Sequence, residues 1–307
     1  ALMKAVNEGR LDMSPSVVGH WDLCLQCRAC ELACPSGVEY GKLMEATRAQ
    51  VEQHTKRSFT ERAARSIGYN TMLPSPVKLR MAGSALKFYK KSGMRTIARG
   101  TGLLKLLPGD AELADAYLPE LSDNFFVAKG QIHPAEGVRK AKVAMLTGCV
   151  MALTHADTLE ATVRVLTRNG MEVHLTDGQG CCGALNTHSG QPDSAIEMAK
   201  YNIDSFLSAN PDAIVSASAG CGAAMKDYGE LLSHEPDYVD KAKQVAELTK
   251  DIHELLVEYE FEAPTKTLNV KVTYQDPCHL LNVQQISDAP RAILNAIPGL
   301  ELIERGE

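Results

Sequence analysis

The sequence predicts a multidomain protein in which a small all-α domain precedes α/β domains with a parallel sheet. Two observations predict this order. Four cysteines lie close together within a helical N-terminal region, between positions 24 and 34. From residue 140 onward, short apolar runs alternate with longer segments of helical character, which is typical of a parallel sheet covered by helices. The length of 307 residues is enough for two or three such domains.

The N-terminal cysteines, Cys24, Cys27, Cys30 and Cys34, form the pattern C-x2-C-x2-C-x3-C and are followed by Pro35. This run is typical of ferredoxin-like domains that bind a 4Fe–4S cluster. Three cysteines two residues apart let a tight loop wrap one corner of the cluster, while the fourth leaves the loop. In two-cluster ferredoxins that fourth cysteine ligates the other cluster. Zinc is the alternative, but zinc sites usually combine two separated C-x2-C pairs. We therefore expect a helical iron–sulfur domain over residues 1–60.

The composition is consistent with metal or redox chemistry in a reducing compartment. The chain has nine cysteines, but no secretory signal peptide opens it and no apolar run reaches the length of about 18 residues that a membrane span needs. This predicts a cytoplasmic location. The net charge of −6 gives no reason to expect a nucleic-acid partner.

Residues 61–137 are predicted to form a basic helical connector. Positions 62–109 contain ten Lys and Arg residues and no Asp or Glu, and a helix is expected over 77–91. Two interpretations stay open: a solvated basic face, or a docking surface for an acidic partner subunit or for anionic lipid. Some of these charges could also balance an anionic cluster. The stretch 110–137 has the character of a linker.

Residues 138–264 are predicted to form the first complete α/β domain, and 265–307 the start of another. Strands are expected at 143–147, 171–175, 213–218 and 270–274. Helices are expected at 154–169, 194–208 and, as one long stretch, 238–259. The remaining five cysteines directly follow predicted strand ends; they are Cys149, Cys181, Cys182, Cys221 and Cys278.

The carboxyl edge of a parallel sheet is where ligands bind, and helix N-termini there favour thiolates. We therefore expect Cys149, Cys181, Cys182 and Cys221 to hold a second metal cluster, with zinc as the main rival. Cys278 is a weaker candidate ligand, because an isolated cysteine is often only a small buried hydrophobe.

No catalytic residue is predicted. The sequence contains no acid–base constellation, no G-x-G-x-x-G at a strand–helix turn and no P-loop. His188 and His279 stand near cysteines and could be ligands or proton relays, although a lone histidine is more often structural. Asp276 could orient the Cys278 loop by capping. The predicted work is one-electron relay by metal clusters.

Several stretches resemble a known family. They are the run Cys-Pro-Ser-Gly-Val-Glu-Tyr-Gly from Cys34, Gly-Cys-Cys-Gly-Ala-Leu from Gly180, Ala-Gly-Cys-Gly-Ala-Ala-Met-Lys-Asp-Tyr-Gly from Ala219, and Tyr-Gln-Asp-Pro-Cys-His from Tyr274. The order of Cys149, then Cys181-Cys182-Gly183, then Cys221 resembles the cysteine-rich CCG domains of heterodisulfide reductase and of flavin dehydrogenase subunits, and the stretches above are similar to the glycolate oxidase branch of this group. Among these proteins, the chain most resembles the iron–sulfur subunits of glycolate oxidase (glycolate dehydrogenase).

The resemblance implies a two-cluster ferredoxin-like domain followed by two CCG domains. It implies electron transfer from an FAD-containing glycolate oxidase subunit toward quinone or the respiratory chain, with 4Fe–4S clusters on this chain, a further subunit, and peripheral contact at the inner face of the cell membrane. Lactate, glycerol 3-phosphate and heterodisulfide systems are alternatives, because they share the fold. A zinc-stabilised interaction module is the alternative from another functional class.

The sequence departs from the family pattern in three places. The first four-cysteine motif is absent, so residues 1–60 would be the second half of the ferredoxin-like domain, and the other ligands of the cluster that Cys34 serves are not expected in this sequence. The second CCG unit stops before its own Cys-Cys-Gly. Both features predict a fragment that lacks both termini. Finally, Cys221 is followed by Gly222, Ala223 and Ala224 where the fullest pattern has C-x2-C, so a five-cysteine cluster is not expected.

Overall fold

The N-terminal region is helical, as predicted. The computed structural model describes residues 1–107 and 110–304. The first four helices are α1 (Leu2–Asn7), α2 (Pro15–Asp22), α3 (Ala29–Leu32) and α4 (Tyr40–His54). Helix α2 begins where the Ser14 hydroxyl accepts a hydrogen bond from the backbone N–H of Val17 at 3.4 Å, with proline at the first helical position. Trp21, Met44 and Val51 form a small core between α2 and α4.

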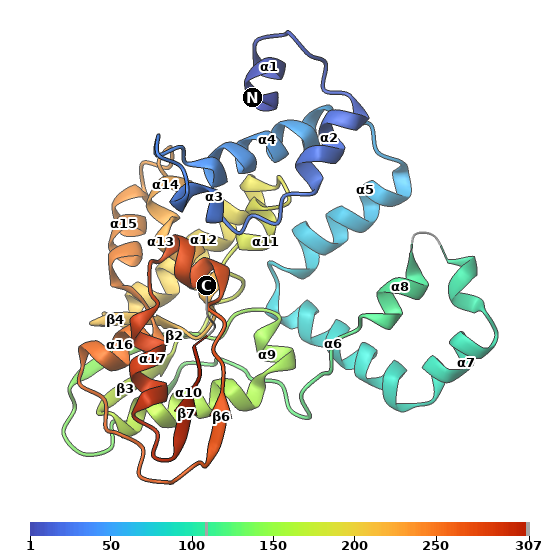
Figure 1. The fold of residues 1–307 in the computed structure, drawn as a ribbon. Coiled ribbons are helices and arrows are strands. Elements are labelled where there is room, and N and C mark those ends of the chain that lie inside the picture. Colours follow the sequence, from blue (N-terminus) through green and yellow to red (C-terminus); the bar gives the residue numbers. More distant parts are fainter. Residues whose placement is uncertain (108–109, 305–307) are drawn as a thin grey trace.

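A helical lobe follows this region. Its elements are α5 (Phe59–Arg65), the π-helix η1 (Ser66–Met72), α6 (Pro76–Lys91), α7 (Met94–Gly100), the 3-10 helix η2 (Leu103–Leu106) and α8 (Ala111–Ala116). The predicted helix over 77–91 is therefore present as α6. In Figure 1 α7 and α8 stand away from the sheet, with α7 at the outer edge, whereas the first residue of α6, Pro76, packs against Gly180 in the loop after β3.

The α/β region is built on a five-stranded sheet. Its strands are β1 (Gln131–His133), β2 (Ala141–Leu146), β3 (Met171–Leu175), β4 (Ala213–Ser216) and β5 (Thr249–Asp251), in the order β1-β3-β2-β4-β5. β2, β3, β4 and β5 are parallel, whereas β1 is antiparallel to β3. The parallel sheet was predicted, and the antiparallel edge makes it mixed.

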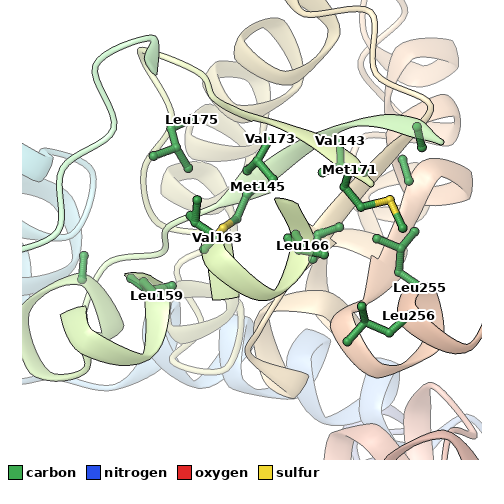
Figure 2. Packing of buried hydrophobic residues seen from close by; sticks show 14 residues of the cluster. Val143, Met145, Leu159, Val163, Leu166, Met171, Val173, Leu175, Leu255 and Leu256 are labelled. Carbon is green, nitrogen blue, oxygen red and sulfur yellow. The ribbon is translucent and has the colours of Figure 1, made fainter. Parts of the chain in front are cut away.

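Helices cover both faces of this sheet. They are α9 (Met151–Thr154), α10 (Ala156–Arg168), α11 (Ala184–Thr187), α12 (Pro192–Ser208), α13 (Ala219–Lys226), α14 (Tyr228–Leu231), α15 (Val239–Leu248) and α16 (Ile252–Glu258). Residues of α10 and α16 pack with β2 and β3 in one core, which Figure 2 shows around Leu159, Leu166 and Leu255. Residues of α12, α13 and α15 pack on the other face, around Phe206 and Met225. Because both faces are buried there, the central strands β2 and β4 are nearly continuous apolar runs, whereas β3 alternates buried apolar with half-buried polar residues.

Two predictions about single elements were wrong. The helical stretch expected over 238–259 is interrupted by β5, because Thr249, Lys250 and Asp251 pair with β4. Asp251 then starts α16 through a capping box with Glu254. The stretch 110–137, predicted as a linker, contains α8 and contributes β1 to the sheet.

The order of the strands creates a topological switch point. From β2 the chain crosses to β3 on one side and then returns to β4 on the other side of β2. The loops after β2 and β4 therefore diverge at the carboxyl edge of the sheet, which leaves a crevice where ligands bind in open α/β sheets. The cysteines at these strand ends consequently face a common space.

A small C-terminal unit follows. It consists of β6 (Val270–Val272), the π-helix η3 (His279–Val283), α17 (Asp288–Asn295) and β7 (Leu300–Leu302), and β6 and β7 are parallel. Across the described residues, no helix has both the length and the apolar character required to traverse a lipid bilayer.

Candidate metal centres

The N-terminal cysteine loop is bent by two residues in the left-handed region, Gln26 (φ 57°) and Arg28 (φ 58°). The sulfur of Cys24 accepts a hydrogen bond from the backbone N–H of Gln26 at 3.4 Å. Glu31 holds the loop against α4, because it accepts hydrogen bonds from Arg28 Nε (2.9 Å) and from the backbone N–H of Gly41 (2.5 Å). The loop is thus pinned on both sides of its cysteines.

Three of these cysteines influence one another. Partial desolvation raises the pKa of Cys30, and the charges of Glu31, Cys24 and Cys27 act in the same direction. The pKa of Cys34 is instead lowered by backbone hydrogen bonds from its own loop, chiefly that of Val38. Cys30 is exposed, and the other three cysteines are half-buried.

The structure brings together the four cysteines predicted to meet at the carboxyl edge of the sheet. Cys149 follows β2, Cys181 and Cys182 follow β3, and Cys221 lies in the first turn of α13 after β4. Side-chain hydrogen bonds join Cys149 to Cys181, Cys181 to Cys182, and Cys182 to Cys221. All four line one cavity of about 370 Å³.

The four thiols differ in acidity. Hydrogen bonds from Cys149 and then Cys182 lower the pKa of Cys181 to about 4. A hydrogen bond from Cys182 likewise lowers the pKa of Cys221. Cys149 and Cys182 are the donors, so their own pKa values are raised, first by these hydrogen bonds and then by burial. The thiolate form, which binds metals, is therefore favoured at Cys181 and Cys221.

Three residues that the sequence did not single out hold this site in place. The buried side-chain amide of Gln179 connects the loop after β3 to β2. Its oxygen accepts a hydrogen bond from the backbone N–H of Thr147 (2.8 Å), and its nitrogen donates one to the carbonyl of Met145 (3.0 Å). Asn202 accepts from the N–H of Gly180 (2.9 Å).

The same Asn202 side chain also donates to the Cys181 carbonyl at 2.8 Å. The Tyr228 hydroxyl donates to the Cys182 carbonyl at 3.0 Å. Polar side chains on the buried faces of α12 and α14 were the available signal for Asn202 and Tyr228, because buried polar groups almost always have partners.

The donor set fits an iron–sulfur cluster. Four thiols, two of them with lowered pKa values, surround a cavity at the switch point of the sheet, and thiolates are the ligands that hold such clusters. Within residues 1–107 and 110–304, no three His, Cys, Asp or Glu side chains are arranged to hold a single metal ion.

Cys278 lies apart from these four cysteines. It is exposed, and its sulfur is 3.6 Å from Nδ1 of the neighbouring His279. The role predicted for Asp276 was wrong: no side chain caps η3, and both oxygens of Asp276 bind Arg291, at 2.8 and 2.7 Å. The guanidinium fork matches the carboxylate better than a backbone N–H does.

The two histidines near the cysteines come together. The rings of His188 and His279 stack with centroids 5.8 Å apart, and both residues line the cavity of the four cysteines. Nδ1 of His188 lies 3.0 Å from Oε1 of Glu45 on α4. Burial lowers the pKa of His279. His188 thus links the edge of the sheet to the N-terminal region.

Arg48 of α4 joins the two cysteine-bearing regions. It donates to the carbonyl of Cys24 at 2.6 Å and to that of His188 at 2.7 Å. Asn282 of η3 also reaches the N-terminal loop, donating to the carbonyl of Cys27 at 2.7 Å. This contact brings α4 against the end of α11, and Figure 1 shows these two helices next to each other.

Comparison with known proteins identifies the family. The cysteine-rich domain of the CCG type matches residues 143–226 and 272–306, and the linker region of the glycolate oxidase iron–sulfur subunit matches residues 60–117. The chain is 36% identical to the probable glycolate oxidase iron–sulfur subunit of Bacillus subtilis strain 168, over 99% of this chain and 69% of that protein. It is 33% identical to the glycolate oxidase iron–sulfur subunit of Escherichia coli strain K12, over 95% and 67%.

The chain belongs to the family of glycolate oxidase iron–sulfur subunits. The resemblance predicted from the sequence is therefore confirmed. A more distant relative is lactate utilization protein A of Bacillus licheniformis, 32% identical over 52% of this chain and 67% of that protein. No solved structure matches the chain.

The family match covers the basic connector as well as the cysteines. The linker region common to glycolate oxidase iron–sulfur subunits spans α5 to α8. The cysteine-rich match includes the four cysteines at the sheet edge and Cys278. The two parts of the chain that the sequence reading separated, the connector and the α/β region, are thus both features of this family.

Proposed function

We propose that this chain is the electron-transfer subunit of a flavin-linked glycolate dehydrogenase. In this role it oxidises no substrate itself and relays electrons one at a time from FAD on a partner subunit toward quinone or the respiratory chain. The observation that carries the proposal is the convergence of Cys149, Cys181, Cys182 and Cys221 on one cavity. Membership in the family of glycolate oxidase iron–sulfur subunits supports the choice of substrate.

Two kinds of cluster site follow from this proposal. Cys24, Cys27 and Cys30 hold one 4Fe–4S cluster in a ferredoxin-like helical domain, and Cys34 serves another cluster. The four cysteines at the sheet edge hold a further iron–sulfur cluster, and Cys278 belongs to a second CCG unit that begins near residue 265.

A bound cluster supplies reversible one-electron reduction, and this chain's residues control its surroundings. Burial and hydrogen bonds from loop groups to sulfur set the potential of such clusters. Asn202 and Tyr228 fix the backbone of the vicinal cysteines, and both side chains are buried. Arg48 fixes the approach of the N-terminal loop to the sheet edge.

The proposed partners are the FAD-containing glycolate oxidase subunit and a further subunit, with no nucleic acid involved. The proposed location is cytoplasmic, with peripheral contact at the inner face of the cell membrane. Lactate is the second candidate substrate, supported by the similarity to lactate utilization protein A.

The test is anaerobic purification of the intact complex, followed by addition of glycolate or lactate. We expect the complex to be brown and its visible absorbance to decrease when glycolate is added. The isolated subunit should be bleached by dithionite. If lactate bleaches the complex and glycolate does not, the substrate of the complex is lactate and not glycolate. A colourless protein that contains zinc and no iron would support the interaction module instead and overturn the redox role.

A further inference from the structure

The solvent-facing side of α6 is apolar. Val77, Met81 and Phe88 recur at helical spacing along this helix and are 55%, 68% and 65% exposed. The opposite side of the helix holds Gly83, which is buried against Phe125. A surface helix normally turns its apolar stripe toward the core. On α6 this apolar stripe faces solvent instead.

Exposed apolar side chains also lie on the two elements that follow α6. Ile97 on α7 is 65% exposed, and Leu103 and Leu106 on η2 are 51% and 82% exposed. Figure 1 places α7 at the outer part of the lobe, away from the sheet. Exposed apolar side chains that gather on neighbouring elements, as α6, α7 and η2 are, mark interaction surfaces.

Most of the basic side chains of the lobe are used internally. Asp115, which is nearly buried, binds Arg95 and Arg99, at 3.2 and 2.5 Å. Burial alone would raise the pKa of Asp115, but hydrogen bonds led by that of Arg99 outweigh it and lower the pKa. Lys90 binds Glu120 at 2.7 Å.

Lys91 likewise binds Asp123 at 2.9 Å. These ion pairs neutralise many of the basic side chains that the sequence suggested as a docking surface.

The remaining charge on α6, α7 and η2 is positive. Positions 76–107 contain no Asp or Glu. Within the part of the chain that the structure describes, Lys78, Arg80 and Lys105 form no ion pair. The chain as a whole carries a net charge of −6. An anionic surface would therefore attract this lobe and repel the rest of the molecule, which orients the protein.

We propose that the surface formed by Val77, Met81, Phe88, Ile97, Leu103 and Leu106, which we call the lobe face, binds the surface of an anionic lipid bilayer. An apolar stripe flanked by lysine and arginine is the pattern by which helices lie in a membrane interface. The apolar side chains enter the boundary between headgroups and acyl chains, while the exposed Lys78 and Lys105 contact the headgroups. The lobe face would be the part of the protein that makes the peripheral membrane contact proposed above. Its binding to lipid does not depend on the electron-transfer role.

The test is sedimentation of the full chain with vesicles of phosphatidylcholine containing phosphatidylglycerol. We expect binding that strengthens with phosphatidylglycerol and weakens with salt. The triple variant Phe88→Ser, Ile97→Ser, Leu106→Ser should lose about tenfold or more of its partition coefficient, because its apolar insertion is lost. Charge reversal of Lys78 and Lys105 should remove the preference for phosphatidylglycerol.

The matched control is Val138→Ser, Tyr201→Ser, Val257→Ser, which removes three exposed apolar side chains from the α/β region. It should bind vesicles like the parent protein. Circular dichroism and dithionite bleaching, followed in all variants, separate membrane binding from folding and from cluster function. Absence of vesicle binding by the parent, or equal binding by the folded triple variant, would overturn the proposal. Loss of a co-purified protein subunit without any change in vesicle binding would assign the lobe face to that subunit and also overturn it.

Discussion

At the scale of single residues, the vicinal cysteines depend on one asparagine. Asn202 is fully buried on α12 and serves the N–H of Gly180, the carbonyl of Cys181 and the hydroxyl of Tyr228. The geometry of Cys181 and Cys182 therefore rests on a residue that contributes no sulfur.

Replacing Asn202 by leucine should destabilise the α/β region strongly. The change leaves a buried N–H and a buried C=O without partners, and such losses cost about 2–4 kcal/mol in total. Urea unfolding followed by circular dichroism measures the cost. Tyr201→Leu, an exposed neighbour on the same helix, is the control and should stay within about 0.5 kcal/mol of the parent. Equal stability of the two variants would contradict the role given to Asn202.

At the scale of elements, the sequence located the strands better than the connections. The strands β2 and β4 were predictable because they are mostly apolar and buried on both faces, and β3 because buried apolar residues alternate with polar ones along it. β5 was not, since Thr249-Lys250-Asp251 has no apolar residue and becomes a strand only by pairing with β4. β1 was also missed. Its three residues are too few to show a periodic pattern, and they form a strand by pairing with β3.

The same contrast holds for the site. The cysteines were predictable as a group, because the chain places each one just after a strand and parallel strands end at one edge. Gln179, Asn202 and Arg48 were not, because their hydrogen bonds join segments far apart in the sequence. Asp276 was misjudged because Arg291, fifteen positions later, offers it a stronger partner than the loop does.

The packing of α4 on the turn after α11 should be sensitive to one glycine. Gly190 has φ 74°, and a Cβ there would come within 2.7 Å of the Arg48 carbonyl carbon. Gly190→Ala therefore combines backbone strain with a clash against backbone that cannot move away cheaply. We expect a loss of stability of about 3 kcal/mol or more, made up of about 1 kcal/mol for the left-handed backbone and the remainder for the displaced helix.

The chain offers a matched control for this prediction. Gly137 has φ 80° and open space around its Cβ position. Gly137→Ala should therefore show only the backbone cost, about 1 kcal/mol. Urea unfolding gives both values, and limited proteolysis reports release of the N-terminal helices. Similar losses in the two variants would mean that α4 does not depend on this close approach.

At the scale of the whole molecule, the two cysteine-bearing regions are joined by polar contacts rather than by a shared apolar core. Their cores are separate clusters of buried residues. The contacts between them include Arg28 with Asp227 at 3.2 Å, Lys42 with Glu230, and His188 with Glu45. Interfaces of this polar kind permit relative motion, so the relay that we propose requires a contact that fixes the distance between the two sites.

Arg48 provides such a contact, because one guanidinium binds the carbonyl of Cys24 and that of His188. Arg48→Ala should weaken this docking by about 2–4 kcal/mol, as hydrogen bonds from a charged group are each worth about 1.5–3 kcal/mol. In the intact complex, electron transfer between the N-terminal clusters and the sheet-edge cluster should slow, while reduction by glycolate of whichever site receives electrons first from FAD stays fast. Rapid-freeze electron paramagnetic resonance separates these two steps. Arg164→Ala, which removes an exposed arginine from α10, should change neither. If Arg48→Ala slows both steps equally, its effect lies upstream of the contact between the regions, and the docking argument fails.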